Sequence, residues 1–509
     1  MLILNSTSNR PSPVFAQAPS VNRTVIPSPY VTEFAVPDSN AGPYGIVVDS
    51  RGSVWFMDIN SSSIYLFRPA NRTFTRYQYQ VEKVSTLGTT GAAGGQLAYA
   101  DDGRIWFTEA DANAIGVLDP VTGQFEFYTL RVPNAGPFDI KVAKDGSIWF
   151  TELFANRIAR LDPISKRRVE YSLPSERAGP AMLAFDADGK IWFSEAFGSK
   201  IGLFDPSLGQ EGTSNGMHKF TPPYELASPV GIAVADEVIW VADHGGSSFS
   251  MFVPSANTWQ QFWVSPPPPE ADSPESLTND LAIDTQGHIW LAEHVGNRMA
   301  RFDPVTQLLT EYELPTRPLS ITLWLALDPV GNVWFTQWAV GQIGVVNATT
   351  KPRFTVAATS GVLLLAPEGK TSVEISVAVV DASPSPLTLS VMGMTTTGPR
   401  NLSYEFTPSV IRATERGNSV TNLTLKAQPS LEAGRYLMMV RASDPTIIQS
   451  AVVELIVQPG RTATGGVEVL YVAVPVAVAA TVGGAALLYR HHKRIQTGRA
   501  SGMHPPSKT

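Results

Sequence analysis

The chain has 509 residues, a formal net charge of −7 at pH 7, 43% hydrophobic residues and 16% charged residues. This length predicts more than one domain, and the balance of apolar and charged residues excludes a disordered chain. The mild acidity argues against nucleic acid as a partner. The absence of cysteine excludes disulfides, thiolate metal sites and cysteine nucleophiles, and the 40 glycines and 40 prolines indicate many turns and therefore β-structure.

The N-terminal segment, residues 1–30, is polar and rich in proline, which predicts that it is disordered. Within it, Ala16, Gln17 and Ala18 form an A-x-A sequence of the kind found at signal-peptide cleavage sites. We therefore interpret this segment as the remnant of a signal peptide.

Residues 31–349 contain a repeated short run centred on tryptophan. The runs are SVWFMD, RIWFTE, SIWFTE, KIWFSE, VIWVAD, HIWLAE and NVWFTQ. Their tryptophans are Trp55, Trp106, Trp149, Trp192, Trp240, Trp290 and Trp334. Successive tryptophans are 43 to 51 residues apart, which is the length of a propeller blade, and each unit contains four strand-sized pieces. The repeat predicts an all-β, seven-bladed β-propeller over residues 31–349.

The seventh unit lacks an outer strand. Residues 31–37 (VTEFAVP) are similar to the outer strands of other units, such as LTEYELP. We predict that this N-terminal strand completes the last blade and closes the ring.

The C-terminal third of the chain has a different pattern. Residues 350–459 form short alternating strands rich in Thr, Ser and Val, which predicts an immunoglobulin-like β-sandwich serving as a stalk. Residues 460–466 are predicted to be a linker. Residues 467–490 contain 21 consecutive uncharged residues, enough to cross a bilayer, and predict one transmembrane α-helix.

The residues after this run indicate a topology. The tail, residues 491–509, is basic, so the positive-inside rule places it in the cytoplasm and the preceding domains outside the cell, with the membrane as a partner. Seven N-x-S/T triplets precede the apolar run, as expected for a glycoprotein exposed outside the cell. The candidate glycosylation sites in the predicted domains are Asn60, Asn71, Asn347, Asn401 and Asn422.

The repeat GP-x-x-I-x-x-x-x-x-G-x-IWFTE-x-x-x-N-x-I-x-R-x-D-P resembles that of the streptogramin B lyase (virginiamycin B lyase) family of seven-bladed propellers. The resemblance covers residues 31–349 and implies a ring-opening elimination on cyclic depsipeptide antibiotics. It also implies a magnesium ion and catalytic histidine and glutamate groups, with histidines at the start of inner strands in late blades. The corresponding positions here are Tyr44, Gly95, Phe138, Ala181, Val230, Asn279 and Leu323. None is histidine, so the base that such an elimination needs is missing.

A carboxylate follows the tryptophan by three residues in six of the seven units. These carboxylates are Asp58, Glu109, Glu152, Glu195, Asp243 and Glu293, with Gln337 in the seventh unit. One interpretation is an acidic funnel for a divalent metal, Mg or Ca, with Asp243, Glu293 and Glu195 as ligands. The other is that each carboxylate accepts backbone N–H groups in its own turn.

Two histidines occupy corresponding places in adjacent units, His244 directly after Asp243 and His294 directly after Glu293. Imidazole beside carboxylate suits metal binding or proton transfer, which makes Glu293, His294 and His244 candidate catalytic residues. The alternative is two exposed turn histidines. Two long connections, residues 81–95 and 264–279, are predicted to lie on the same face, as binding elements or as tolerated insertions.

Taken together, these patterns favour a cell-surface, membrane-anchored propeller that binds a ligand through a lyase-like scaffold without the catalytic histidines. The ligand class stays open among small molecules, glycans and proteins. A metal-dependent streptogramin-type lyase or lactone hydrolase is one alternative, and a structural envelope protein is another.

Overall fold

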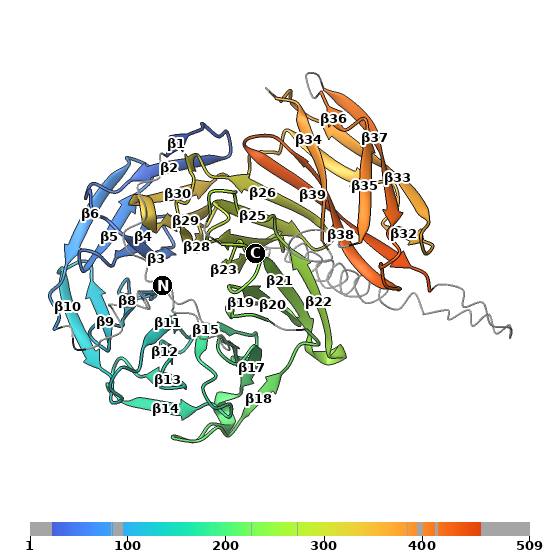
Figure 1. Cartoon of the computed structure of the whole chain (residues 1–509). Coiled ribbons are helices and arrows are strands. Elements are labelled where there is room, and N and C mark those ends of the chain that lie inside the picture. Colours follow the sequence, from blue (N-terminus) through green and yellow to red (C-terminus); the bar gives the residue numbers. More distant parts are fainter. Residues whose placement is uncertain are drawn as a thin grey trace, which may run out of the picture.

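The computed structural model describes residues 23–459 apart from 83, 85–94, 225, 272, 384, 394–400 and 413–415. Seven four-stranded antiparallel units form a ring (Figure 1). Units one to four contain β3 (Pro43–Val48), β4 (Val54–Asp58), β5 (Ser63–Arg68), β6 (Thr73–Gln78); β7 (Leu97–Tyr99), β8 (Ile105–Glu109), β9 (Ala114–Asp119), β10 (Gln124–Thr129); β11 (Pro137–Val142), β12 (Ile148–Glu152), β13 (Arg157–Leu161), β14 (Arg168–Ser172); and β15 (Pro180–Phe185), β16 (Ile191–Glu195), β17 (Lys200–Phe204), β18 (Met217–Phe220). Units five to seven contain β19 (Pro229–Ala235), β20 (Val238–Asp243), β21 (Ser248–Val253), β22 (Thr258–Trp263); β23 (Thr278–Ile283), β24 (Ile289–Glu293), β25 (Arg298–Asp303), β26 (Leu308–Glu313); and β28 (Thr322–Leu327), β29 (Val333–Gln337), β30 (Gln342–Val346). The predicted propeller is confirmed.

The predicted closure of the ring is also confirmed. Strand β2 (Val31–Ala35) pairs antiparallel with β30, with Val31 opposite Val346 and Ala35 opposite Gln342. Blade seven therefore contains strands from both ends of the repeat region, and the first and last blades are held together by backbone hydrogen bonds. A two-residue ladder between β1 (Thr24–Val25) and β27 (Thr316–Arg317) adds a second contact of the N-terminal segment.

The repeated tryptophan is held by the turn that precedes its strand. In blade one, Oδ1 of Asp49 accepts the backbone N–H groups of Arg51 and Ser53, each at 2.9 Å. Its Oδ2 accepts the indole N–H of Trp55 at 3.2 Å. The same Asp–Trp bond, six residues apart, recurs in blades six and seven. In these three blades the bond fixes the turn and the buried indole together, which explains the spacing of Asp and Trp there.

The repeated asparagine connects neighbouring blades. Asn156 lies in the left-handed region with φ 59°, which asparagine tolerates better than most residues. Its side-chain amide donates to the carbonyl of Ser175 at 2.7 Å and accepts the N–H of Ala178 at 2.8 Å, both in the connection to the next blade. Asn113 and Asn297 make equivalent pairs of bonds. This repeat residue is therefore structural.

Residues 354–457 form two packed sheets. One has the order β31 (Phe354–Ala358), β33 (Lys370–Val379), β37 (Gly417–Ala427), β35 (Leu402–Thr407). The other has the order β39 (Ile447–Val457), β38 (Gly434–Ser443), β34 (Leu387–Gly393), β36 (Val410–Ile411), with β32 (Val362–Leu365) parallel to β39. Alternate residues point inward, as the alternating sequence predicts. These sheets form a sandwich; the finer immunoglobulin-like assignment has no support from related proteins.

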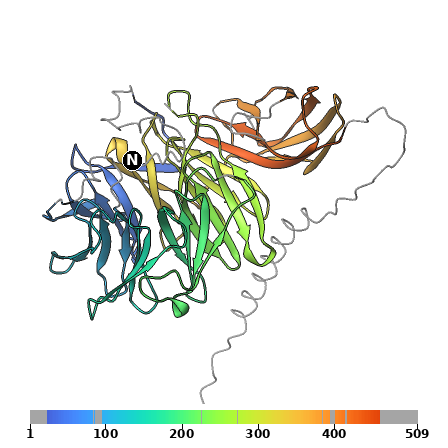
Figure 2. The ribbon, with the colours of Figure 1, turned by 60° about the horizontal axis from the view of Figure 1, so that its bottom comes forward.

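The sandwich is fused to the propeller. Strand β39 pairs antiparallel with β26, the outer strand of blade six, from Leu308 opposite Ala451 to Tyr312 opposite Ile447. One apolar core runs from Trp290 and Tyr312 of blade six into the sandwich, and Figure 2 shows the sandwich beside the ring. The two parts therefore share a sheet and a core, and the role of the sandwich as a stalk stays a prediction.

The prediction of a transmembrane helix in the fold is wrong for the part of the chain that the structure describes. No helix in these residues is long and apolar enough to cross a membrane. The helices present are single 3-10 turns of three residues, Pro206–Leu208, Pro254–Ala256 and Trp338–Val340, far shorter than the roughly 20 residues that a span requires. The predicted span, residues 467–490, lies outside the described residues. The fold is all-β.

Candidate functional site

One face of the propeller is formed where the inner strands begin and the second strands end. The pairing shows this in blade after blade, because Pro43 lies opposite Asp58, Pro180 opposite Glu195 and Thr278 opposite Glu293. We call the surface made by these strand ends the funnel face. It carries all the catalytic and metal-binding candidates predicted from the sequence.

The centre of the funnel face is closed by aromatic and aliphatic side chains. Trp324 of blade seven is almost fully buried. Its ring centroid lies 5.8 Å from that of Tyr44 in blade one and 5.7 Å from that of Phe138 in blade three, both in edge-on contact. Ala181, Val230 and Leu323 are also buried. Five of the seven positions that correspond to the family's histidines, together with Trp324, therefore form an apolar floor; the others are Gly95 and Asn279, whose amide donates to the Leu323 carbonyl.

Below this floor, polar groups connect the inner strands. The Asp139 carboxylate accepts the N–H of Leu183 in the next blade at 2.8 Å and pairs with Lys141 Nζ at 2.7 Å. Asp280 accepts the N–H of Leu325 in its next blade at 3.1 Å. Burial raises the pKa of Asp280 to about 7. These aspartates bridge neighbouring blades and have a structural role.

The two aspartates of the carboxylate series cap turns. Asp243 accepts the N–H groups of Ser228 at 2.8 Å and Ala227 at 3.2 Å, and the Ser248 hydroxyl at 3.3 Å. Asp58 accepts the N–H groups of Gly42 and Asn60 in the same way. Asp58 thus accepts an N–H group of its own turn, as the turn interpretation predicts, whereas the N–H groups on Asp243 come from the connection that precedes β19.

The glutamates of the series are buried and lie in separate surroundings. Both carboxylate oxygens of Glu152 are buried without a hydrogen-bond partner, and burial, followed by repulsion from Glu170, raises the pKa of Glu152 to about 7. Glu195 accepts the Ser175 hydroxyl at 3.3 Å, and burial raises its pKa as well. Glu293 pairs with Arg298 at 2.9 Å.

The predicted metal ligands are therefore not brought together. Asp243 belongs to a turn of blade five, Glu195 to blade four, and Glu293 to an ion cluster with Arg298. No group of three His, Asp or Glu side chains in the described residues has the geometry to hold a metal ion. A divalent metal, Mg or Ca, stays a prediction without a site.

His244 and His294 do meet, as their corresponding positions predict. Nε2 of His244 lies 3.0 Å from Nδ1 of His294, and the rings stack with centroids 5.2 Å apart. Both side chains are buried, so the expectation of exposed turn histidines is wrong. Burial lowers the pKa of His244 to about 4 and that of His294 well below its ordinary value. Near neutral pH the pair is uncharged, with one ring donating to the other.

The buried pair predicts an acid-sensitive stability. The unfolded histidine binds a proton below its ordinary pKa of 6.5, whereas folded His244 stays neutral down to about 4, so protons favour the unfolded state. Between pH 7 and pH 5, His244 alone should cost about 2 kcal/mol of folding stability. Denaturant titrations of the wild type and of the His244→Asn/His294→Asn variant measure this, and the variant should lose less stability on acidification.

The matched control is His218→Asn, because His218 is exposed on β18. This control should show the pH dependence of the wild type. The buried carboxylates with raised pKa values act in the opposite direction but are common to all three proteins. Equal pH dependence in the wild type and the double variant would contradict a neutral buried pair.

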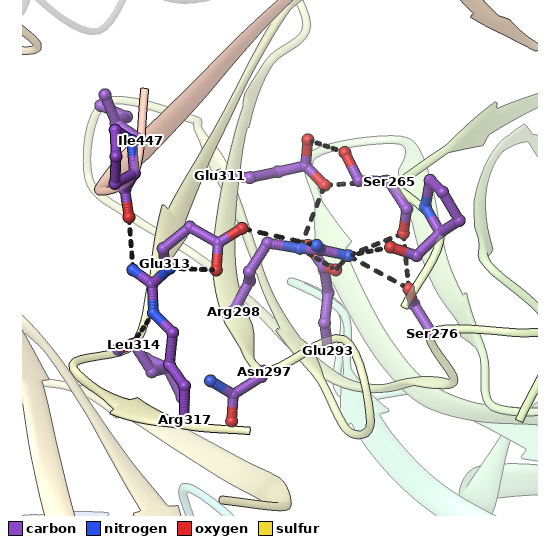
Figure 3. A network of polar contacts seen from close by, with 12 residues as sticks. Ser265, Ser276, Glu293, Asn297, Arg298, Glu311, Glu313, Leu314, Arg317 and Ile447 are labelled. Atoms are coloured by element: carbon purple, nitrogen blue, oxygen red, sulfur yellow. Dashed lines mark hydrogen bonds and ion pairs between the residues drawn. The ribbon is translucent and has the colours of Figure 1, made fainter. Parts of the chain in front are cut away.

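Sequence reasoning missed the ion cluster around Arg298, which is buried in blade six. Its guanidinium contacts Glu293 at 2.9 Å, Glu311 at 3.6 Å and Glu313 at 3.6 Å (Figure 3). Burial lowers the pKa of Arg298, but attraction to the three carboxylates has the larger combined effect and holds this pKa above its ordinary value. The sequence offers little signal for it, because the corresponding positions hold Ser63, Ala114, Arg157, Lys200, Ser248 and Gln342.

The fold and the funnel face define a β-propeller of seven blades whose centre is closed by apolar side chains. Residues 29–265 match the family profile of the virginiamycin B lyase family. The propeller is therefore virginiamycin B lyase-like. No curated protein matches the chain closely enough in sequence to count as a relative.

Solved structures support the same fold. Virginiamycin B lyase from Staphylococcus aureus has 24% identity and a TM-score of 0.53, over 62% of this chain and 98% of that chain. A streptogramin B lyase structure has 25% identity and a TM-score of 0.54, over 62% and 97%. A catalytically inactive histidine-to-alanine variant of the S. aureus enzyme, with quinupristin, has 23% identity and a TM-score of 0.53, over 62% and 98%. These matches leave out the sandwich.

Proposed function

We propose that this protein binds an apolar or aromatic ligand at the funnel face and does not catalyse the lyase reaction. The observation that carries the proposal is the floor of the funnel face, where Trp324 contacts Tyr44 and Phe138, and where the late-blade positions at which the lyase resemblance implies histidine hold Val230, Asn279 and Leu323. Loss of one histidine is enough to inactivate the S. aureus lyase. An elimination without a base at that place has no group to remove the proton.

Aromatic side chains at the edge of the funnel face support ligand binding. Phe154 and Phe197 follow the second strands of blades three and four, and their ring centroids are 6.1 Å apart. Phe154 is 37% exposed, which is high for phenylalanine, although its ring also packs against Phe197 and over Gly136. Trp338 occupies the equivalent turn of blade seven and is partly exposed. Such side chains bury large apolar ligand surfaces at low entropic cost.

The enzymatic alternative has less support. His244 and His294 are buried and hydrogen-bond to each other, so neither presents a basic nitrogen to a substrate at the surface. Their low pKa values also make them weak bases at neutral pH. Glu293 is fully buried and bound to Arg298, so its carboxylate is not presented to a substrate at the surface, although burial, only partly opposed by Arg298, raises its pKa well above the ordinary value.

Quinupristin provides the direct test, because it is present with the structurally similar lyase. We expect the full chain, incubated with quinupristin and magnesium, to leave the compound intact by liquid chromatography, under conditions in which the S. aureus enzyme opens it. Binding is measured by quenching of tryptophan fluorescence. Phe154→Ala should weaken binding several-fold, because it removes the exposed ring.

Exposed Val121 provides the matched control, since it lies in a turn of blade two at the outer edge of the ring. Val121→Ala should leave quinupristin binding unchanged. Turnover of quinupristin by the full chain would overturn the non-catalytic proposal. Binding that is unaffected by Phe154→Ala would remove the funnel edge from it.

The location of the protein and its glycosylation stay predictions. The side chains of the candidate asparagines are all exposed; they are Asn60, Asn71, Asn347, Asn401 and Asn422. Exposure is necessary for glycan attachment but does not demonstrate it.

A further inference from the structure

A cavity of about 710 Å³ lies between blade six and the sandwich. One wall is the loop Pro266–Pro269, which connects β22 to β23. The other wall belongs to the sheet that the two domains share, with Arg298 on β25, Glu313 on β26 and Arg441 on β38. The cavity is separate from the funnel floor and has the volume of a small-molecule site.

The charged groups of this wall lie on one face of the shared sheet. Arg298 on β25 lies opposite Glu313 on β26. Two residues away on β26, Glu311 lies opposite Ile448 on β39, and Ile448 lies opposite Ser443 on β38. Residues that lie opposite each other, or two apart on one strand, point to the same face of a sheet. Arg441 is two residues from Ser443 on the same strand and therefore points to the same side. The side chain at the next equivalent position, Met439, belongs to the apolar cluster of blades five and six, and the proline loop lines the same cavity as Arg441.

The buried carboxylates around Arg298 already have partners, whereas Glu270, which also lines the cavity, is exposed to solvent. Glu293, Glu311 and Glu313 surround Arg298, as Figure 3 shows. Glu313 also pairs with Arg317 at 3.6 Å, and Glu311 accepts the N–H of Ser265 at 2.7 Å. Arg298 and Arg317 thus share the negative charge of these three glutamates.

Asp444, on the sandwich side of the cavity, is also satisfied. Its Oδ1 accepts the N–H groups of Thr446 at 2.7 Å and Ile447 at 3.1 Å. Its Oδ2 accepts the hydroxyl of Ser383 at 3.1 Å. This aspartate fixes the turn between β38 and β39 and does not form an ion pair with Arg441.

Arg441 is the cation left over. It makes no hydrogen bond or ion pair with any described residue, and its Nε is buried without a partner. Burial lowers the pKa of its guanidinium, and attraction to Glu311, opposed by repulsion from Arg298, does not make up for the burial. A partly buried guanidinium whose Nε has no hydrogen-bond partner is costly, so the site favours an anion that accepts this bond.

We propose that this cavity binds a small carboxylate ligand, with its carboxylate on the Arg441 guanidinium and an apolar body against Pro266–Pro269. A guanidinium pairs with a carboxylate through two parallel hydrogen bonds. A single negative charge fits better than a phosphate dianion, because Glu313 and Asp444 also line the cavity. Ile448 and the proline rings provide the apolar walls. This site lies beside blade six, separate from the apolar floor at the centre of the funnel face.

The test uses the full chain with benzoate and hexanoate, their neutral amides, and inorganic phosphate. Titration calorimetry and thermal melting measure binding. We expect both carboxylates to bind the wild type and raise its melting temperature, whereas the amides and phosphate have no effect. Arg441→Gln should bind the carboxylates at least tenfold more weakly. Arg435→Gln is the matched control, because Arg435 lies on the same strand but pairs with Glu454, and it should bind like the wild type.

Several results would overturn the proposal. They are equal binding by Arg441→Gln and the wild type, equal binding of amides and carboxylates, tighter binding of phosphate, or no effect of either carboxylate. Should Arg441→Gln fail to fold, Arg441→Lys keeps the charge and removes the planar fork. It should then bind more weakly than the wild type, and unchanged affinity would contradict the two-point contact.

Discussion

Replacing Arg298 by methionine should lower the free energy of unfolding by about 3–5 kcal/mol, the cost of removing one partner from a buried ion pair. Arg298 is 4% exposed and contacts three carboxylates. Methionine fills much of the same volume but leaves Glu293 and Glu311, both fully buried, without their cation. The effect comes from these stranded charges rather than from lost packing.

Denaturant unfolding of the full chain measures this loss. The control is Arg416→Met, because Arg416 pairs with Asp381 at 2.8 Å but both side chains are exposed. It should change stability by less than about 1 kcal/mol, as exposed ion pairs do. Adding Glu293→Gln to Arg298→Met should recover part of the loss. A change as small as that of the control would show that the cluster contributes little to folding.

A chain that ends at residue 349 should associate or precipitate rather than fold as a free propeller. Removing the sandwich exposes the backbone edge of β26, from Leu308 to Tyr312, which β39 covers in the complete fold. It also exposes the part of the shared apolar core that contains Trp290 and Tyr312. An uncovered strand edge beside apolar surface is a template for pairing with other chains.

Size-exclusion chromatography with light scattering tests this expectation. A chain that ends at residue 459 is the matched control, since it keeps β39, and it should elute as a uniform species. A monomeric 1–349 chain with an unchanged thermal transition would show that the propeller is stable alone. The shared sheet would then contribute nothing that the propeller needs for folding.

The propeller was predictable because its determinants are local. The bond from Asp49 to Trp55 joins residues six apart, and such spacing is visible in the sequence. The pairing of β2 with β30 is distant, but the outer-strand pattern VTEFAVP made it recognisable. The pairing of β26 with β39 was not, because an outer strand that is covered has the same alternation as one that faces water. The buried side-chain hydrogen bond from Gln449 to Thr310, at 2.8 Å, joins these two strands, and the sequence of neither strand predicts it.

The candidate site was predictable in position but not in environment. The blade period correctly placed His244 beside His294. It did not reveal that both are buried, because burial at a turn depends on which connections pack over it. Arg298 and Arg441 carried even less signal, since one lies in a repeat and the other in a separate domain, and only the tertiary fold brings them to one cavity.

The sheet shared by blade six and the sandwich also determines how the molecule bears load. A domain on a flexible linker swivels, whereas one joined by paired strands keeps a single angle to its neighbour. Tension applied beyond Val457 passes along β39 and shears its ladder with β26, so several backbone hydrogen bonds must break together. The orientation of the sandwich therefore determines the direction in which the funnel face points.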